Sequence, residues 1–577
     1  MTLGIAGDSN ITAGDVALYR AAFLPSSYSS NQPNIIVDGN DPGINGDAVE
    51  ALLDLEVSGG IAPGAKVNFY TSADTDLQAG LFLAVFRALD DNSVSILNVS
   101  FGACEANEGA SGNAEVLAAW EQAAAQGISV TVATGDSGSA SCDNDNSETA
   151  AQFGLAVSGI ASTPYNIAVG GTDYDVLANS FSTYVAASNS SQNAASTFYR
   201  TALSYIPESP WNDSTSTNAG GYTANQPLKD SNGNTNIAGG GGGISSCSDQ
   251  TSAGACLGGY ATPPFQTGLS GFPYTARALP DVSFLAADGL YNALWVVCSD
   301  YISNGSPTAA PPDCEQTNGS FTSATTFSGV GGTSAAAPAF AGMLALVSQS
   351  QGGVRLGQAN NVLYNLAAQS ALYPTVFHDV TTGNNSVVCE SGTTNCGSND
   401  FLTGYNAGTG YDAASGLGSV DVSQLIANWT KAVFTPTTTG LTINGGTGAI
   451  NVKHGTSLNF AVSVSPTAAT GDVSIVNNSG VTNNGALGQF LTLSGGKATL
   501  SSGDLPGGGP YNVYAYYGGD IKDAASQSSP IQVTISPESS QVAIGATMID
   551  PLTGSVVCDD VTGSAPSCTT ASSLQYG

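Results

Sequence analysis

The spacing of apolar residues changes once along this chain, and that change limits what the chain can fold into. Before about residue 430, short apolar runs such as KVNFY, ISVTVATGD and YNIAVGG alternate with helix-like stretches, including DAVEALLDLEV and AEVLAAWEQAAAQG. Buried strands alternating with helices predict an α/β domain built on a mainly parallel sheet. A chain of 577 residues also exceeds the roughly 250 to 300 residues that one hydrophobic core serves. We therefore expect more than one domain.

A second pattern begins after the segment FTPTTTG, Phe434–Gly440. Runs such as LNFAVSVS, DVSIVN and IQVTIS alternate in period two between turn residues, which predicts an all-β sandwich. The run YNVYAYYGGD, Tyr511–Asp520, resembles the penultimate strand of bacterial immunoglobulin-like repeats. The predicted organisation is an α/β domain over 1–432, a linker over 433–438, an immunoglobulin-like sandwich over 439–536 and a tail or truncated repeat over 537–577.

Acidic residues outnumber basic ones by 44 to 11. Such a chain has no basic surface to attract nucleic acid or anionic lipids, and no run of about 20 apolar residues is present to span a bilayer. We therefore expect neither nucleic acid nor membrane as a partner. Near pH 4 many carboxylates are protonated and their mutual repulsion falls, which suits an acidic environment. A surface that merely keeps a secreted protein soluble is an equally good interpretation.

The ten cysteines fall into five pairs of sequence neighbours. This spacing predicts five local disulfides, and it leaves other pairings open. Only two histidines and no CxxC are present, which argues against a zinc site. We expect an oxidising, extracellular location and, by default, a monomer. The expected pairs are Cys104 with Cys142, Cys247 with Cys256, Cys298 with Cys314, Cys389 with Cys396, and Cys558 with Cys568.

Two further segments matter for the architecture. The start, MTLGIAGDSN, lacks the basic and long apolar regions of a signal peptide, so we expect Met1 to mark a processed or engineered start. The Gly/Ser/Asn-rich region 178–271 has weak periodicity and predicts surface loops. It contains five consecutive glycines, Gly239–Gly243. We interpret them as a flexible stretch, with close approach of another backbone as the alternative.

Ser334 is the candidate nucleophile. It lies in SGVGGTSAAAPAFAGMLALV, where small residues surround it and an apolar helix follows directly. Small neighbours let a substrate backbone approach the hydroxyl, and the positive end of the helix dipole helps to stabilise a developing negative charge. The backbone N–H of Ser334 itself is a candidate oxyanion donor. The alternative is a helix N-cap serine in a Gly/Ala-rich packing motif.

A nucleophilic serine needs a base, and histidine is the usual one. His454 lies in the predicted sandwich and His378 has no motif of its own, so a carboxylate must take this role. Glu50 and Asp54 stand at i and i+4 in GDAVEALLDLEV and share a helical face, where two close carboxyls hold one proton between them. The alternative is a solvated acidic face.

A third acid, Asp136, follows the strand-like run ISVTVAT. Sites of α/β domains gather at such strand ends, and a protonated Asp136 could donate to an oxyanion. A turn-forming aspartate is the alternative.

Taken together, these segments resemble the sedolisin, or serine-carboxyl peptidase, family, which has a subtilisin-like fold and a glutamate base. Four motifs agree in order. The ExxxD helix is matched by Glu50 and Asp54, the SGD turn by Thr134–Asp136 and the GTSxxxP motif by Gly332–Pro338, while GYNAGTGYDAASGLGS resembles the calcium loop. This chain departs from the family in Thr134, where serine is common, in an insertion carrying Cys389 and Cys396, and in lacking the large pro-domain.

The resemblance implies a secreted, acid-active peptidase that cleaves protein or peptide substrates. Ser334 would attack the scissile carbonyl, Glu50 would take its proton, Asp54 would hold and tune Glu50, and protonated Asp136 would stabilise the oxyanion. The resemblance also implies one structural Ca²⁺, a hard ion that prefers oxygen ligands. An ordinary Gly-rich turn is the alternative to this site. The implied ligands are the carboxylates of Asp379 and Asp412 and the backbone oxygens of Val380, Gly408 and Gly410.

Three other functions compete with this one. An inactive secreted binding protein would keep the peptidase fold and use the sandwich to contact a surface or polysaccharide, but all four catalytic positions are filled. A conventional subtilisin-like peptidase would need a histidine base. A purely structural cell-surface protein is suggested only by the Gly/Ser/Thr-rich composition.

Overall fold

The computed structural model describes most of the two predicted domains. It covers residues 1–186, 202–215, 228–229, 233–287, 293–299, 329–477, 490–503, 505 and 507–537, and the backbone alone of 316–317, 320–321, 328, 547–549 and 556–559. Cys314 and Cys568 lie outside these residues, so two of the five expected disulfides cannot be followed there.

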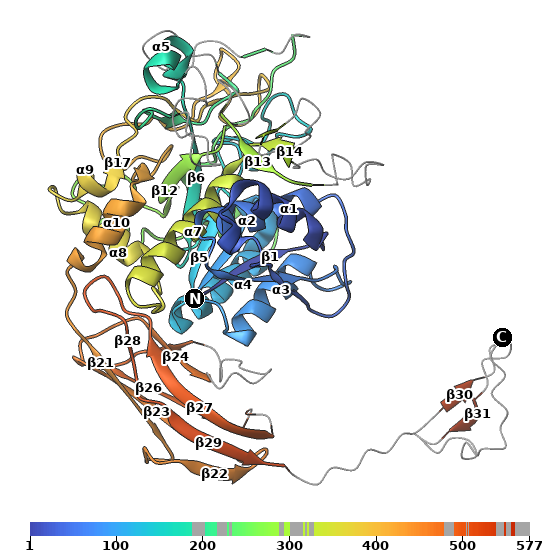
Figure 1. Cartoon of the computed structure of the whole chain (residues 1–577), viewed down its shortest axis with the longest axis vertical. Coiled ribbons are helices and arrows are strands. Elements are labelled where there is room, and N and C mark those ends of the chain that lie inside the picture. The colour runs from blue at the N-terminus through green and yellow to red at the C-terminus, as the bar shows by residue number, and fades with distance from the viewer. Residues whose placement is uncertain are drawn as a thin grey trace.

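The first domain is built on a parallel sheet in the order β12-β6-β5-β4-β1-β3-β2, with β7 antiparallel to β6 at one end. The expected α/β class with a mainly parallel sheet is confirmed (Figure 1). Its strands are β1 (Thr2–Gly7), β2 (Asn34–Val37), β3 (Lys66–Thr71), β4 (Ile96–Val99), β5 (Ser129–Ala133), β6 (Ile167–Asp173), β7 (Ser209–Pro210) and β12 (Val282–Leu285).

Helices cover both faces of this sheet. Successive strand residues point to opposite faces, so Ile5 belongs to one hydrophobic core and Ala6 to the other. The first core also contains α2 (Ala48–Ile61) and α7 (Thr333–Ser350), and the second contains α3 (Gly80–Asp91) and α4 (Glu105–Gln126). Strands buried on both faces read as continuous apolar runs, which explains the pattern in the sequence.

The remaining elements of the first domain are shorter. They are α1 (Ala13–Phe23), η1 (Ser26–Tyr28), α5 (Leu177–Tyr184), β8 (Gly243–Ile244), β9 (Asp249–Gln250), β10 (Cys256–Gly258), α6 (Pro264–Thr267), β11 (Ala278–Leu279), β13 (Trp295–Val297), β14 (Gln316–Thr317), β15 (Ser320–Phe321), β16 (Ser328–Val330), α8 (Asn360–Ala367), α9 (Tyr373–Val376), β17 (Phe377–His378), β18 (Val387–Val388), β19 (Phe401–Leu402), β20 (Ser419–Val420), α10 (Val422–Asn428) and η4 (Trp429–Lys431).

The second domain is an antiparallel sandwich apart from one parallel pair, β22 with β29. Alternate residues of β23 are buried, as the period-two pattern predicts, and the two sheets enclose a core of their own. One sheet holds β21 (Thr438–Ile443), β23 (Leu458–Ser465) and β26 (Lys497–Ser502); the other holds β22 (Ile450–Lys453), β24 (Asp472–Asn477), β25 (Leu491–Thr492), β27 (Gly508–Tyr517), β28 (Ser526–Gln527) and β29 (Ile531–Ser536).

Beyond the sandwich, β30 (Thr547–Ile549) pairs with β31 (Val556–Asp559). The sandwich packs against the first domain at the carboxyl end of α4 (Figure 1). Within the described ranges, no helix has both the length and the apolar character needed to cross a membrane.

Three expected disulfides are present, Cys104–Cys142, Cys247–Cys256 and Cys389–Cys396. Cys298 is also disulfide-bonded.

Candidate active site

The four predicted catalytic residues meet at the carboxyl-terminal edge of the parallel sheet. Glu50 and Asp54 come from α2, Asp136 follows β5, and Ser334 lies in the first turn of α7. The electrostatic environment of Glu50 includes Asp54, Asp136 and Ser334, so three segments far apart in the sequence contribute to one site. The fold thus brings together all the residues that the motifs singled out.

Close packing of α2 against α7 sets the distance between acid and serine. Gly342 of α7 faces Ile61 and Ser58 of α2, and a Cβ at position 342 would lie 2.9 Å from both Ile61 Cβ and the Ser58 carbonyl oxygen. Contacts this short are not tolerated, so only glycine allows the two helices to approach so closely. Glu50 and Ser334 stand on the helices that this contact holds together.

Ser334 is half-buried, and its hydroxyl group has defined partners. Its Oγ donates to the backbone oxygen of Ser100 at 3.1 Å, and its interaction with the Glu50 carboxylate lowers the pKa of Glu50 against the stronger effect of burial. Its backbone N–H belongs to the first turn of α7, where helical N–H groups have no intrahelical partner. The serine therefore offers a nucleophilic oxygen and an anion-stabilising N–H at the same point.

Glu50 and Asp54 are a strongly interacting acid pair. Burial raises the pKa of both carboxyls, and the charge of Asp54 raises that of Glu50 further. Asp54 Oδ1 accepts a 2.6 Å bond from Ser100 Oγ, whereas Glu50 Oε1 is buried without a hydrogen-bond partner among the described residues. Asn98 Nδ2 in turn donates to Ser100 Oγ at 3.0 Å. Asp54 is thus fixed in place, and Glu50 keeps an oxygen free for a proton.

Asp136 contacts Gly332 and Thr333, the two residues directly before the serine. Its Oδ1 accepts bonds from the backbone N–H of Thr333 at 2.7 Å and from Thr333 Oγ1 at 2.8 Å. A Cβ at Gly332 would lie 2.7 Å from Asp136 Oδ2, and Gly332 has a φ of 105°. Both the close contact and the positive φ therefore require glycine at this position. Burial, with a smaller contribution from the charge of Asp145, raises the pKa of Asp136 to about 6. Asp136 is therefore protonated in mild acid.

The five-glycine run supports this strand end, and our interpretation of it as a flexible stretch is wrong. All five glycines are buried. The N–H of Gly239 donates to the backbone oxygen of Asp136 at 2.8 Å, and the N–H of Gly241 donates to the backbone oxygen of Gly135 at 2.7 Å. A Cβ at Gly241 would lie 2.3 Å from the Thr134 oxygen. The run is glycine because its backbone packs directly on the Thr134–Asp136 turn, which is the alternative that the sequence left open.

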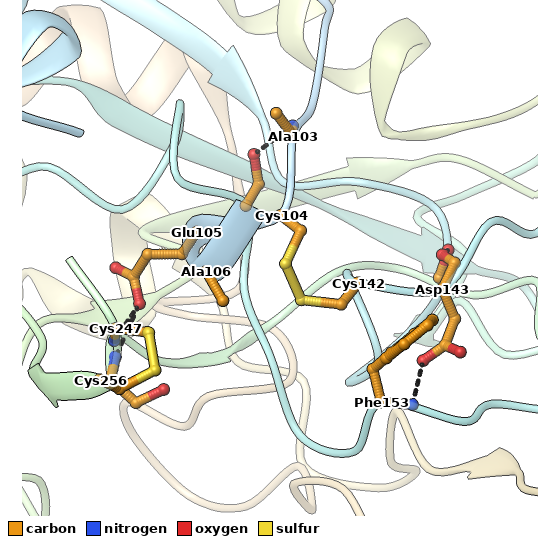
Figure 2. Close-up of a disulfide and its surroundings, with 12 residues drawn as sticks. Ala103, Cys104, Glu105, Ala106, Cys142, Asp143, Phe153, Cys247 and Cys256 are labelled. Carbon is orange, nitrogen blue, oxygen red and sulfur yellow. Dashed lines mark hydrogen bonds between the residues drawn. A yellow bond between two sulfur atoms is a disulfide. The ribbon is translucent and has the colours of Figure 1, made fainter. Parts of the chain in front are cut away.

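A cavity of about 370 Å³ opens beside the serine. Ser334, Asp136 and Gly102 line it, together with the disulfide-bonded Cys104 and Cys142. Figure 2 shows this disulfide joining the start of α4 to the loop that carries Asp143. The cavity is a suitable place for a substrate side chain next to the attacked bond.

Hydrogen bonds hold both ends of that disulfide. Glu105 Oε2 accepts from the backbone N–H of Cys247 at 2.7 Å, and Asp143 Oδ2 accepts from that of Phe153 at 3.3 Å (Figure 2). The cavity wall is therefore fixed by covalent and polar contacts rather than by apolar packing alone.

Neither histidine belongs to this site. His378 stacks on Tyr205 with a ring-centroid distance of 3.8 Å, and His454 follows β22 in the sandwich. Neither is among the described residues that line the cavity. A carboxylate is therefore the base that the geometry offers to Ser334.

The residues expected to hold calcium also lie together. Asp379 Oδ2 accepts from the N–H of Gly410 at 3.0 Å, and Asp412 Oδ2 accepts from that of Gly408 at 2.9 Å. Burial raises the pKa of Asp412 to about 6, and no ion pair to either aspartate is found in the described part of the chain. Val380, next to Asp379, is buried. Asp412 Oδ1 also accepts hydrogen bonds from the N–H groups of Ala414 and Ser415 and from Ser415 Oγ. The loop thus holds this carboxylate without an ion pair, which leaves its net charge available to a cation.

Only two carboxylates lie in this loop, and the described residues contain no cluster of three or more His, Cys, Asp or Glu side chains. Backbone oxygens would have to complete a calcium shell.

Sequence reasoning missed several supporting residues. Ser100 and Asn98 fix Asp54, and Thr333 fixes Asp136. Ser100 follows a buried strand, a positional signal that was available, but its partner Asp54 lies far away in the sequence.

Comparisons with known proteins agree with this geometry. A model of the subtilase family matches residues 34–405, and a model of the bacterial Ig-like domain (group 3) matches residues 446–536. The solved structure of Pseudomonas sedolisin, a serine-carboxyl proteinase complexed with two molecules of pseudo-iodotyrostatin, is 27% identical with a TM-score of 0.50, over 75% of this chain and 92% of that one.

Curated relatives are similar over the same region. Xanthomonalisin of Xanthomonas sp. (strain T-22) is 30% identical over 68% of this chain and 39% of its own length. Kumamolisin of Bacillus sp. (strain MN-32) is 28% identical over 68% and 51%, and sedolisin of Pseudomonas sp. (strain 101) is 29% identical over 65% and 48%. The chain thus spans about half the length of these relatives or less.

Proposed function

Since the chain belongs to the subtilase family and its relatives are sedolisin-type peptidases, we propose that it is an acid-active serine-carboxyl peptidase with Ser334 as nucleophile and Glu50 as general base. The observation that carries the proposal is the site itself. A serine hydroxyl lies beside a buried carboxyl pair, and a third carboxyl, protonated in mild acid, contacts the residue before the serine.

The reaction uses these groups in two halves. Ser334 Oγ attacks the scissile carbonyl carbon while Glu50 takes the hydroxyl proton. The carbonyl oxygen becomes an oxyanion, which protonated Asp136 and the Ser334 N–H stabilise by donated hydrogen bonds. Glu50 returns the proton to the leaving amine as the C–N bond breaks. Water then attacks the acyl-enzyme, again with Glu50 as base, and releases Ser334.

The charge state of the three acids determines the pH dependence. Glu50, Asp54 and Asp136 interact, so their protons leave in steps that belong to the group. The active form has lost one proton, from Glu50, and keeps the others. Because the pKa of Asp136 is about 6, this form is lost as the pH rises through that value. At low pH the first proton returns to the Glu50–Asp54 pair. Burial and the charges of Asp54 and Asp136 raise the pKa of Glu50, so the proposal requires that the first proton of the group leaves Glu50 below pH 6. With that order of proton loss, the profile is bell-shaped and centred in acid.

This proposal is tested by the pH dependence of cleavage. A denatured protein substrate is incubated from pH 2 to 8 with the natural chain, Ser334→Ala and Glu50→Gln. We expect maximal cleavage in acid and a loss of about 10⁴- to 10⁶-fold in either variant. Full activity of Glu50→Gln would exclude Glu50 as the base. Activity peaking at neutral pH would favour a conventional subtilisin-like peptidase, and no activity at any pH would favour a binding protein.

Other properties belong to the same proposal. Three disulfides in the described residues support an oxidising, extracellular location, where the substrates are proteins or peptides. For the Asp379–Asp412 loop we propose one structural calcium ion, held by the two carboxylates and by the backbone oxygens of Val380, Gly408 and Gly410. Its contribution is to neutralise the buried charge of Asp412 and fix the loop.

A further inference from the structure

The immunoglobulin-like domain is docked on the first domain through a specific contact. Tyr516 of β27 lies against the turn that ends α4, and a Cβ at Gly127 would lie 2.5 Å from Tyr516 Cζ. A Cβ at Gly357 would lie 3.3 Å from the Tyr516 hydroxyl oxygen. Two glycines therefore form the seat of one aromatic ring from the other domain.

Arg355 lies beneath this seat. It donates to Asn92 Oδ1 at 2.6 Å and to the Gln126 oxygen at 2.9 Å. Its charge also interacts with Tyr514 and Tyr516 of the sandwich. The guanidinium thus joins the ends of α3 and α4 to β27, and the contact is a packed interface rather than a chance approach of two tethered domains.

Two carboxyl groups face each other across the same interface. Glu121 of α4 and Asp472 at the start of β24 line the same groove between the domains, and each affects the pKa of the other. Glu121 Oε1 also accepts from the Tyr165 hydroxyl at 2.8 Å, while Asp472 Oδ1 is buried with no hydrogen-bond partner in the described residues. Two carboxylates cannot bond to each other unless one of them carries a proton.

The charged neighbours do not relieve this pair. Lys522 and Asp520 line a groove of about 650 Å³ that also contains Glu121 and Asp472, but in the described part of the chain Lys522 forms no ion pair. From β25, Thr492 is a neutral group that lowers the pKa of Asp472. From β27, Tyr517 lies near Asp472, with Asp520 and Asp523 beyond it. Apart from Lys522, which forms no ion pair in the described residues, these surroundings are neutral or acidic, so a shared proton is what can join the two carboxyls.

We propose that Glu121 and Asp472 share a proton that holds the immunoglobulin-like domain against the first domain, so that docking is tight in acid and weakens toward neutral pH. This inference does not depend on the proposed catalytic function.

The direction of the pH dependence follows from the linkage between proton binding and docking. Burial, followed by the contact with Asp472, raises the pKa of Glu121 from 4.5 to about 7. The docked form therefore binds the proton more tightly than a solvated carboxyl does, and docking is strongest below pH 4.5. Between pH 4.5 and about 7 the docking equilibrium constant falls by up to about tenfold per pH unit, because undocking then releases one proton.

The test measures exposure of Tyr516 in the full chain. Ser334→Ala serves as background to prevent self-cleavage, and hydroxyl-radical modification is quantified by mass spectrometry at pH 5 and pH 8. Tyr516 is 6% exposed and covered by the first domain, whereas Tyr517 is 0% exposed inside the sandwich core and serves as the internal reference. We expect the ratio of modification at Tyr516 to that at Tyr517 to rise at least about fivefold at pH 8.

Two amide variants decide whether the shared proton is responsible. In Glu121→Gln the amide donates to Asp472, and in Asp472→Asn it donates to Glu121, so neither needs a proton. Both are expected to keep a low ratio at pH 8, while Glu115→Gln, an exposed position on the same helix, should behave like the background. A rise at pH 8 in both amide variants, or a constant ratio in the background, would overturn the proposal.

Discussion

At the scale of single residues, the three acids around Ser334 differ in their hydrogen-bond partners, and the different tasks proposed for them rest on this difference. Asp54 accepts a bond from Ser100 Oγ, Asp136 accepts two from Thr333, and Glu50 Oε1 has no partner among the described residues. A group whose bonds are already made is held in position, whereas a group with a free oxygen can take a proton. This difference in hydrogen bonding supports the proposal that Glu50 is the base.

Replacing Asp136 by asparagine keeps a hydrogen-bond donor for the oxyanion but removes the group that loses its proton near pH 6. In Asp136→Asn the new amide would still accept from Thr333 through its oxygen and would donate through its nitrogen at every pH. This variant should therefore keep kcat/KM within about tenfold of the natural chain at pH 4 and lose the fall near pH 6. Asp136→Ala should lose about 10²- to 10³-fold at every pH. An unchanged midpoint in Asp136→Asn, measured from pH 3 to 8, would assign the fall to the Glu50–Asp54 pair instead.

At the scale of elements, the site depends on where α2, β5 and α7 end and begin. The strands and helices were predictable, since β23, β24 and β29 coincide with their apolar runs and α2 and α7 follow their helical spacing. The catalytic motifs could likewise be found from local sequence. The tertiary role of Gly239–Gly243 could not, because a glycine needed for close packing and a glycine in a flexible loop look the same without their neighbours.

Gly342 offers a test of the packing that sets the Glu50–Ser334 distance. Gly342→Ala would push α2 away from α7, because its methyl group would meet Ile61 Cβ and the Ser58 oxygen at 2.9 Å. We expect a loss of about 1–3 kcal/mol in unfolding free energy and a fall of at least about tenfold in kcat. Ala339→Gly, also buried in α7, costs about 1 kcal/mol without pushing the helices apart and should keep kcat. Equal kcat values in the two variants would contradict this role.

At the scale of the whole molecule, stability combines two domains, their interface and the Asp379–Asp412 loop. Among the described residues, acids without an ion-pair partner recur in these places, in keeping with a chain that has 44 acidic and 11 basic residues. Protons and cations can each offset such charge. The acidic composition by itself could not show which carboxylates need a proton or a cation to offset their charge, since that depends on which of them are buried.

Removing calcium should lower the thermal stability of the chain. In the Ser334→Ala background, a chelator at pH 6.5 is expected to lower Tm by about 5 °C or more, because an ion at 100 times its Kd contributes about 2.7 kcal/mol. Added Ca²⁺ should restore Tm. Asp412→Asn should have a low Tm that neither treatment changes, while Glu390→Gln, an exposed acid in the neighbouring loop, should respond like the background. If a chelator leaves the Tm of the Ser334→Ala variant unchanged, the proposal of a bound calcium ion is wrong.

The most direct test of the account is to capture the acyl-enzyme. The chain is mixed with an activated peptide ester at pH 4, quenched in strong acid within milliseconds, digested and examined by mass spectrometry. We predict an acyl group on Ser334, absent from Ser334→Ala, forming at least about 10³-fold more slowly in Glu50→Gln. An acyl group on another residue, or substrate turnover with no acyl group on Ser334, would contradict the proposal that Ser334 is the nucleophile.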